Sequence, residues 1–213
     1  MRQALTPTDR TNVTPSSPAA PTRTRILDAA EELMGSIGLV RATTKEIARA
    51  AGCSEAALYK HFSSKEELFV AVLQERLPAL GPLLRDLMAD PGDRGIEECL
   101  TEIARSAALF YDASTPIGAS LFADPALLRR HRDGLRPMGA GPHQPLRELA
   151  AYLRTERAHG RIHPDANPDA AAALLLGACF QRAFLRHFLG EAPEPADAFA
   201  TALARTLLAG IGR

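Results

Sequence analysis

The chain has 213 residues, 46% of them hydrophobic, which is enough for one small and one medium folded domain. Its 25 basic and 25 acidic residues cancel, which excludes a generally basic surface that coats nucleic acid but allows a local basic patch. No stretch approaches the roughly 18 consecutive apolar residues of a membrane span, and the first residues lack the hydrophobic centre of a signal peptide. We therefore expect a cytoplasmic protein without a membrane partner.

Residues 1–21 are rich in Thr, Pro, Ser and Ala, a composition typical of a disordered tail. Helical periodicity begins directly afterwards. Apolar residues at helical spacing predict a first helix that ends at Gly38: Ile26, Leu27, Ala30, Leu33, Met34 and Ile37.

Two short helices are expected next. Thr43 followed by Glu46 is a capping box and predicts a helix of about two turns, after which Gly52 can adopt the positive φ of a tight turn. Ser54 caps the following helix, in which Leu58 and Phe62 lie four residues apart on one buried face. Two helices in this order predict a helix-turn-helix.

A third helix begins at a second capping box, Ser64 to Glu67, and runs to Leu77, where Pro78 ends or kinks it. Between Gly38 and Lys65 basic residues outnumber acidic ones, so the net charge there is positive. The basic residues are Arg41, Lys45, Arg49, Lys60 and Lys65, and the acidic ones are Glu46 and Glu55.

The motif resembles the DNA-binding signature of the TetR family of transcriptional regulators over about residues 23–75. The residues that carry the resemblance are Ser54, Leu58, Tyr59, His61, Phe62, Lys65 and Leu68. It implies an all-α protein with three parts: a disordered tail at 1–21, a three-helix DNA-binding domain at 22–68, and a helical effector-binding and dimerisation domain at 69–213.

The resemblance also implies the DNA contacts. Phosphates would be held by Thr44, Tyr59, His61 and Lys65, helped by Thr43, Lys45 and Ser54 at the helix starts. Bases would be read by Glu55, Ala56, Ala57 and Lys60. For Glu55 a second interpretation stays open, a solvated carboxylate that only interacts with the helix dipole.

The rest of the chain is periodic at helical spacing, and we expect helices at 94–112, 116–131, 143–159, 168–189 and 195–209, with a loop at 133–145. The helix at 168–189 is apolar nearly all round, so a second copy should cover part of it. A homodimer built from the last two helices of each subunit is also what the family resemblance implies. A central core helix in a monomer is the alternative.

The resemblance further implies a small, apolar effector bound in the larger domain. Candidate pocket residues are Met88, Phe110, Tyr111, Phe122, Phe180, Gln181 and Arg182, although each large apolar residue among them suits an ordinary core. Gln181 and Arg182 interrupt an apolar helix, so they lie at its exposed edge or are paired. Cys53, Cys99 and Cys179 lack metal-site spacing and are expected to be buried free thiols.

These observations favour a homodimeric repressor that binds double-stranded DNA at an inverted-repeat operator and is released by a small effector. No cofactor and no metal are expected. An enzyme is disfavoured because no nucleophile elbow, phosphate-binding Gly loop or paired-carboxylate motif is present. A helical ligand-binding or adaptor protein without operator binding is the alternative.

Overall fold

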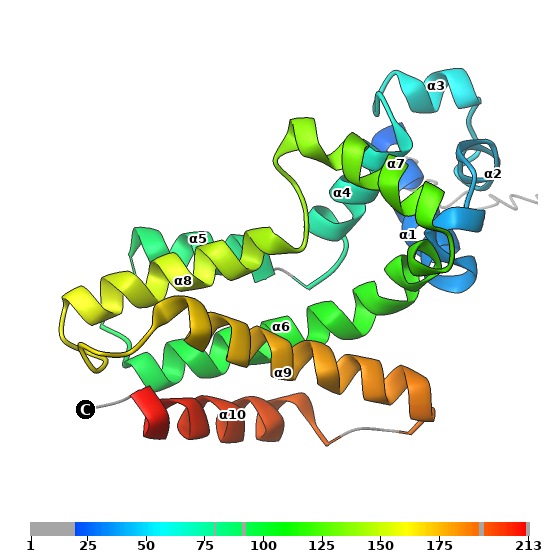
Figure 1. The fold of residues 1–213 in the computed structure, drawn as a ribbon. Helices are drawn as coiled ribbons and strands as arrows, with labels where there is room; N and C mark the ends of the chain where they lie inside the picture. The colour runs from blue at the N-terminus through cyan, green and yellow to red at the C-terminus, as the bar shows by residue number, and fades with distance from the viewer. Residues whose placement is uncertain (1–19, 79, 91–92, 192–193, 212–213) are drawn as a thin grey trace, which may run out of the picture.

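The computed structural model describes residues 20–78, 80–90, 93–191 and 194–211. Within these ranges the chain forms ten α-helices and two short 3-10 helices and no strand, which confirms the all-α prediction (Figure 1). Of the predicted tail, residues 1–19 lie outside the described residues, and Pro21 precedes the first helix.

The N-terminal unit consists of four helices: α1 (Thr22–Arg41), α2 (Thr44–Ala50), α3 (Glu55–Tyr59) and α4 (Lys65–Glu75). The predicted capping box forms as expected, since the Thr43 side chain accepts from Glu46 N and the Glu46 carboxylate accepts from Thr43 N. At α4 the Ser64 side chain accepts from Glu67 N, but the Glu67 carboxylate turns to Ser63 instead of completing a box. α4 ends two residues earlier than predicted.

The C-terminal unit contains α5 (Leu80–Ala89), α6 (Ile96–Ala119), η1 (Ser120–Ala123), α7 (Pro125–Leu135), η2 (Arg136–Met138), α8 (His143–Ala158), α9 (Pro168–Leu189) and α10 (Ala196–Ile211). In Figure 1, α6 is the long central helix, with α5 and α8 on one side of it and α9 and α10 on the other. The predicted bounds of α8 and α9 hold within one residue.

The predicted boundaries near residues 113–115 and 133–145 are wrong. The predicted gap at 113–115 is helical, because α6 continues through Pro116, and residues 116–131 form the end of α6, η1 and most of α7. The start of the predicted loop 133–145 is occupied by the last turn of α7 and by η2. Gly81 and Pro82 lie in the first turn of α5, where proline costs little.

Pro116 is tolerated inside α6 because another group takes over the hydrogen bond that it cannot make. A residue at position 116 would normally donate its N–H to the carbonyl of Asp112, and proline has no N–H. In this chain His187 Nε2 of α9 lies 2.8 Å from Asp112 O. Because a carbonyl oxygen can only accept, Nε2 carries the proton. The hydrogen bond from His187 to Asp112 therefore joins α9 to α6 beside Pro116.

Two apolar cores hold the molecule together. One lies among α5, α6, α8, α9 and α10 and includes Leu100, Leu153 and Leu175. The other fills the N-terminal unit, and it extends beyond the predicted domain boundary at residue 68 to Val72 and Leu77. It also takes in Ile117, Leu121 and Leu135 from α6, η1 and α7, so the two units share a packed boundary.

The end of α1 contacts this boundary at Gly38. The glycine has φ 81° and ψ 156° inside the helix span, a conformation that L-residues with a side chain rarely adopt. A Cβ atom there would lie 2.9 Å from Ser120 Oγ. The same Ser120 hydroxyl accepts from Val40 N at 3.3 Å, so the turn at Gly38 fits closely against η1.

Substitution of Gly38 tests this contact. We expect Gly38→Ala to lower the free energy of unfolding by about 1–3 kcal/mol, because the backbone is left-handed and the added methyl meets Ser120. The control is Gly35→Ala in the same helix, where no atom lies within 4 Å of an added Cβ. It should stabilise by about 0.5–1 kcal/mol through helix propensity. Urea unfolding of both variants is the measurement, and equal effects would contradict the close fit.

Candidate nucleic-acid interface

The turn between α2 and α3 has the geometry predicted from the sequence. Gly52 has φ 64°, and the Ser54 side chain caps α3 by accepting from Ala57 N at 3.1 Å. Leu58 and Phe62 are 0% and 1% exposed, so one face of this segment is anchored in the core. The opposite face therefore points to solvent.

Nearly all the predicted contact residues lie on this outward face. Thr44 and Ala57 are half-buried, and the exposed ones are Thr43, Lys45, Ser54, Glu55, Ala56, Tyr59, Lys60 and His61. Tyr59 is 48% exposed although it is a large aromatic residue. Figure 1 shows α2 and α3 together at the end of the molecule farthest from α10.

A hydrogen-bonded group joins the two helices of the motif. Thr44 Oγ1 donates to Glu55 Oε1 at 2.6 Å and lies 3.4 Å from Tyr59 Oη. This pairing was not predicted, because residues 11 and 15 positions apart carry no periodic signal. It gives Glu55 a third role beside the two left open by the sequence, since its carboxylate positions Thr44.

Lys65 lies at the edge of the outward face and turns toward the boundary between the two units. Its side chain is half-buried, and its Nζ points to the carbonyl of Val40 at 3.4 Å, at the boundary with α7. Burial lowers the pKa of the Lys65 ammonium, and nearby Glu66 opposes this effect. Lys65 thus lies at the contact between the two units, and its predicted phosphate contact stays a prediction.

The helices α1 and α4 form the frame that supports the helix-turn-helix, and ion pairs connect them. Arg23 makes a bidentate pair with Glu75, both contacts at 2.6 Å, and its guanidinium lies 5.2 Å from the ring centroid of Phe62. Arg76 pairs with Asp28 at 2.8 Å. The partners are about 50 residues apart in sequence, so no local pattern could have identified them.

Comparison with known proteins identifies the family. Residues 26–72 match the model of bacterial regulatory proteins of the tetR family, and residues 134–209 match the model of the C-terminal domain of AefR-like transcriptional repressors. The chain belongs to the TetR family. The first match covers α2, α3 and most of α1 and α4, and the second covers α8, α9 and most of α10.

Individual TetR-family relatives are similar over only part of this chain. The transcriptional regulator YvkB of Bacillus subtilis is 40% identical over 70 residues, which are 33% of this chain and 37% of YvkB. UidR of Escherichia coli is 46% identical over 61 residues, 27% of this chain and 31% of UidR. The chain thus spans about a third of the length of these curated relatives.

Solved structures share the whole fold at low identity. A TetR-family regulator from Mesorhizobium loti has a TM-score of 0.68 at 21% identity, covering 93% of this chain and all of that one. SmeT, the repressor of the multidrug efflux pump SmeDEF of Stenotrophomonas maltophilia, has a TM-score of 0.63 at 20% identity, covering 91% of this chain and 92% of SmeT. Both likenesses extend across the two units and support the helix-turn-helix plus helical-domain architecture.

The seven pocket candidates differ in their surroundings, and two of them, Gln181 and Arg182, line a hollow together with Phe199. Phe122 is 76% and Met88 45% exposed, and Phe180 is 50% exposed on α9. Phe110, Tyr111 and Phe180 follow one another in edge-to-face contacts, with ring centroids 5.5 and 5.6 Å apart. Burial raises the pKa of Tyr111 to about 12, so its hydroxyl is neutral. These three rings lie together, and a pocket lined by all seven residues stays a prediction.

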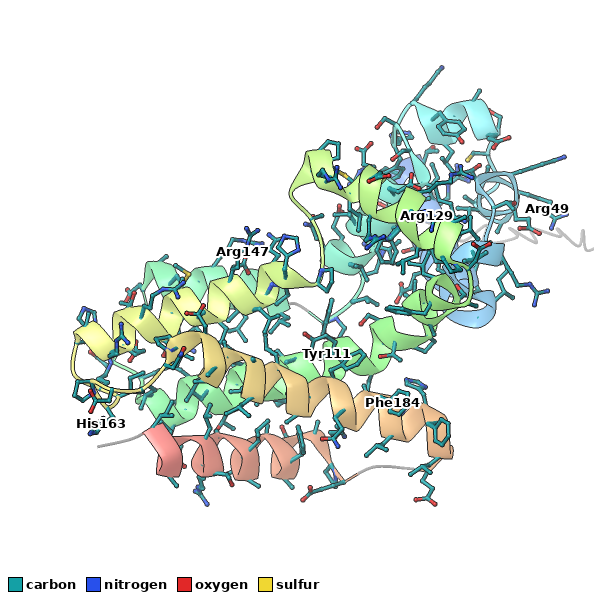
Figure 2. All side chains as sticks on the ribbon, in the orientation of Figure 1. Arg49, Tyr111, Arg129, Arg147, His163 and Phe184 are labelled. Atoms are coloured by element: carbon teal, nitrogen blue, oxygen red, sulfur yellow. The ribbon has the colours of Figure 1, made fainter. Side chains whose placement is uncertain are left out.

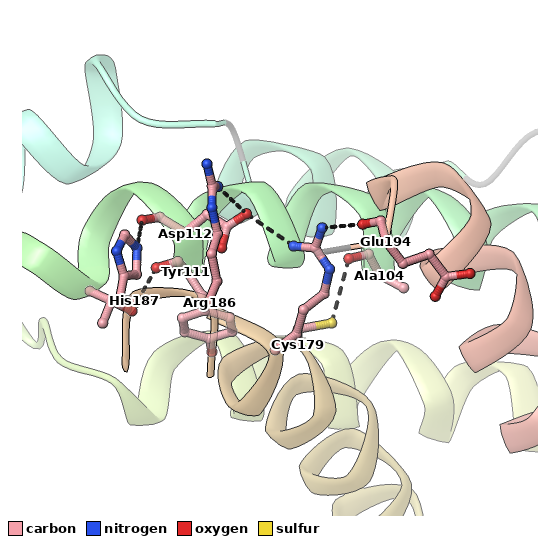
Figure 3. Close-up of polar contacts among 9 residues, drawn as sticks. Ala104, Tyr111, Asp112, Cys179, Arg186, His187 and Glu194 are labelled. Carbon is pink, nitrogen blue, oxygen red and sulfur yellow. Dashed lines mark hydrogen bonds and ion pairs between the residues drawn. The ribbon is translucent and has the colours of Figure 1, made fainter. Parts of the chain in front are cut away.

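The polar residues of α9 are explained by pairing within the chain. Arg182 and Arg186 both donate to Asp112 Oδ2 of α6 at 2.9 Å, and Arg182 also donates to Glu194 O at 2.7 Å (Figure 3). The Arg182 guanidinium lies 5.3 Å from the ring centroid of Phe199. Gln181 is exposed, so both alternatives considered from the sequence occur, one at each residue.

Other site types were also considered. In the described parts of the chain, no group of three or more His, Cys, Asp and Glu could hold a metal ion, and no helix is long and apolar enough to cross a membrane. Cys99 and Cys179 are buried free thiols as predicted, whereas Cys53 is only half-buried. Burial raises the pKa of Cys179 to about 12, and its Sγ donates to Ala104 O at 3.4 Å.

Neutralising Glu55 tests the interface. We expect Glu55→Gln to bind DNA of random sequence about fivefold more tightly, because it removes a negative charge from a surface that would approach polyanionic DNA. The control is Glu98→Gln, which makes the same change at an exposed position of α6. Fluorescence anisotropy at fixed salt is the measurement. Weaker binding by Glu55→Gln would show that the carboxylate contributes mainly by positioning Thr44.

Proposed function

We propose that this chain is a DNA-binding transcriptional repressor that acts as a homodimer on an inverted-repeat operator. The observation that carries the proposal is the outward face of α2 and α3, where hydrogen-bonding and basic side chains surround an exposed Tyr59 within a matched TetR-family segment. A helix that presents such residues at its start is suited to a DNA groove. The proposed domains are those expected from the sequence, with α4 packed on the DNA-binding unit.

Two groups of residues divide the work on DNA. Thr43, Thr44, Lys45, Ser54, Tyr59 and His61 would hold phosphates, and Glu55, Ala56, Ala57 and Lys60 would lie nearest the base edges. Lys65 is left out because its ammonium faces the carbonyl of Val40. The link from Thr44 to Glu55 and Tyr59 supports this division, since it fixes a phosphate-binding group relative to the base-reading helix.

Dimerisation is supported by an unpaired apolar face on α9. Its inner side is packed, with Leu175, Leu176 and Cys179 buried. Its outer side carries half of the exposed large apolar residues found in the described chain, namely Leu174, Phe180, Phe184, Leu185, Phe188 and Leu189. Such a continuous patch is typical of an interface. On α10, by contrast, Phe199, Leu203 and Leu208 pack largely inward, so α9 would supply most of the apolar contact.

A substitution on this face tests the dimer. We expect Phe188→Glu to weaken self-association at least tenfold, because it places a charge where an apolar surface would be buried. The matched control is Phe122→Glu, because Phe122 is 76% exposed, about as much as Phe188 at 74%, but lies in η1. Analytical ultracentrifugation measures the association. If both variants stay dimeric, the dimer does not use this face of α9.

The effector is proposed to be a small, largely apolar molecule that weakens DNA binding from the C-terminal unit. Support comes from the rings of Phe110, Tyr111 and Phe180 and from solved relatives, of which FadR of Bacillus subtilis was crystallised with stearoyl-CoA. The match with FadR has a TM-score of 0.63 at 16% identity and covers 88% of this chain and 98% of the FadR chain. A tenfold loss of operator affinity requires only about 1.4 kcal/mol of coupling.

The decisive experiment is selection of bound sequences from a random DNA pool, followed by a footprint at two salt concentrations. We expect an inverted repeat whose half-site centres lie about one helical turn, roughly 34 Å, apart or slightly more, with affinity that falls steeply with salt. The adaptor alternative predicts neither result. If the intact dimer selects no consensus even after unfolding, dialysis and refolding to remove any bound ligand, the proposal is wrong.

A further inference from the structure

A cavity lies at the boundary between the two units. Its volume is about 230 Å³, and it is framed by Leu39 and Val40 from the end of α1, Leu121 from η1 and Leu127 from α7. These residues give it one largely apolar wall. Figure 1 shows α7 beside α4 and α1, so the cavity lies where the C-terminal unit meets the DNA-binding frame.

The remaining wall is mostly basic. Lys65 and Glu66 from the first turn of α4 face Arg130 and His131 from α7. Neither Lys65 nor Arg130 forms an ion pair with any described residue, and the only hydrogen bond of Lys65 goes to the carbonyl of Val40. One carboxylate, Glu66, therefore stands against two cations and an imidazole in the same small space.

His131 is the group whose burial needs an explanation. It is 8% exposed, it makes no hydrogen bond to a described residue, and its ring lies edge-to-face against that of Phe69 with the centroids 4.9 Å apart. Both ring nitrogens thus lack a hydrogen-bond partner from the described chain, although the side chain lines the cavity. Among the described residues the fully buried polar atoms without a partner belong to Arg25, Asp112 and Arg182, so the His131 nitrogens are accessible from the cavity, where a bound molecule or water can satisfy them.

We propose that this cavity binds a small organic monocarboxylate, whose carboxylate lies among Lys65, Arg130 and His131 and whose apolar body packs against Leu39, Leu121 and Leu127. An anion would satisfy both unpaired cations and accept a hydrogen bond from the imidazole. A purely inorganic anion would leave the apolar wall without a partner, which is why an organic body is part of the proposal.

The site is separate from the proposed DNA contacts and from the three aromatic rings of the C-terminal unit. It adds a second ligand to the proposed function, at a position that touches α1, α4, η1 and α7 together. Because its occupancy is measured on the protein alone, failure of the DNA-binding proposal would not affect the test.

Calorimetric titration of the full chain with benzoate tests the proposal, with benzyl alcohol as the uncharged counterpart and inorganic phosphate as the simple anion. We expect one benzoate per chain, bound at least tenfold more tightly than either control. Equal affinity for benzyl alcohol would overturn the ionic part, equal affinity for phosphate would overturn the apolar part, and no benzoate binding would overturn the proposal as a whole.

Variants locate the site. Arg130→Ala and Lys65→Met should each weaken benzoate binding about tenfold. Arg129→Ala, which removes the same charge from the neighbouring exposed position of α7 outside the cavity lining, should change it less than twofold (Figure 2). An equal loss with Arg129→Ala would mean diffuse attraction to a basic helix and would overturn the site. Thermal unfolding of each variant confirms that it is folded.

The pH dependence gives an independent readout. Burial lowers the pKa of His131, nearby Glu66 opposes this and Lys65 adds to it, so the free imidazole is largely neutral near pH 7. A bound carboxylate raises that pKa, so the complex holds more protons than the free protein, and benzoate should bind more tightly as the pH falls from 8 to 6. His131→Gln should remove this dependence. A pH dependence that persists in His131→Gln would overturn the role of the imidazole.

Discussion

The packed boundary between the two units is the constraint on which the rest of the structure depends. α2 and α3 together have only 12 residues and bury few side chains of their own, so α1 and α4 must hold them. That frame is completed by Ile117, Leu121 and Leu135 from the C-terminal unit. The orientation of the outward face is therefore fixed by residues more than 50 positions away, and any ligand that alters the boundary acts on the DNA-binding surface through apolar packing.

The sequence predicts helix caps and tight turns correctly because these features depend on neighbouring residues. The capping box at Thr43, the positive φ at Gly52 and the Ser54 cap of α3 each rest on interactions within four residues. Where prediction failed, the deciding interaction was distant. Pro116 ends a helix in isolation, but here the Asp112 carbonyl that it leaves free is bonded by His187, 75 residues away.

In the candidate site, too, local patterns predict some features and contacts between helices determine the others. Exposure of Tyr59, Lys60 and His61 follows from the helical face opposite Leu58 and Phe62, so periodicity alone predicts it. The link from Thr44 to Glu55 and the inward turn of Lys65 do not follow, since each depends on how one helix lies against another. The helical period thus predicts which side chains point to solvent, whereas the partner of each side chain depends on contacts between helices.

The polar contacts of Asp112 fix the rotation of the apolar helix α9 about its axis. α9 is apolar on most of its circumference, so burial of apolar area alone would allow several rotations of the helix about its axis. Arg182, Arg186 and His187 can all reach Asp112 in only one of these rotations. In that rotation Leu175 and Cys179 face the core, and Phe184 and Phe188 face outward. We infer that the buried ion pairs contribute orientation more than stability, since a buried pair is costly to desolvate but strongly directional. The apolar surface proposed for the second subunit is then a consequence of how α9 is anchored to α6.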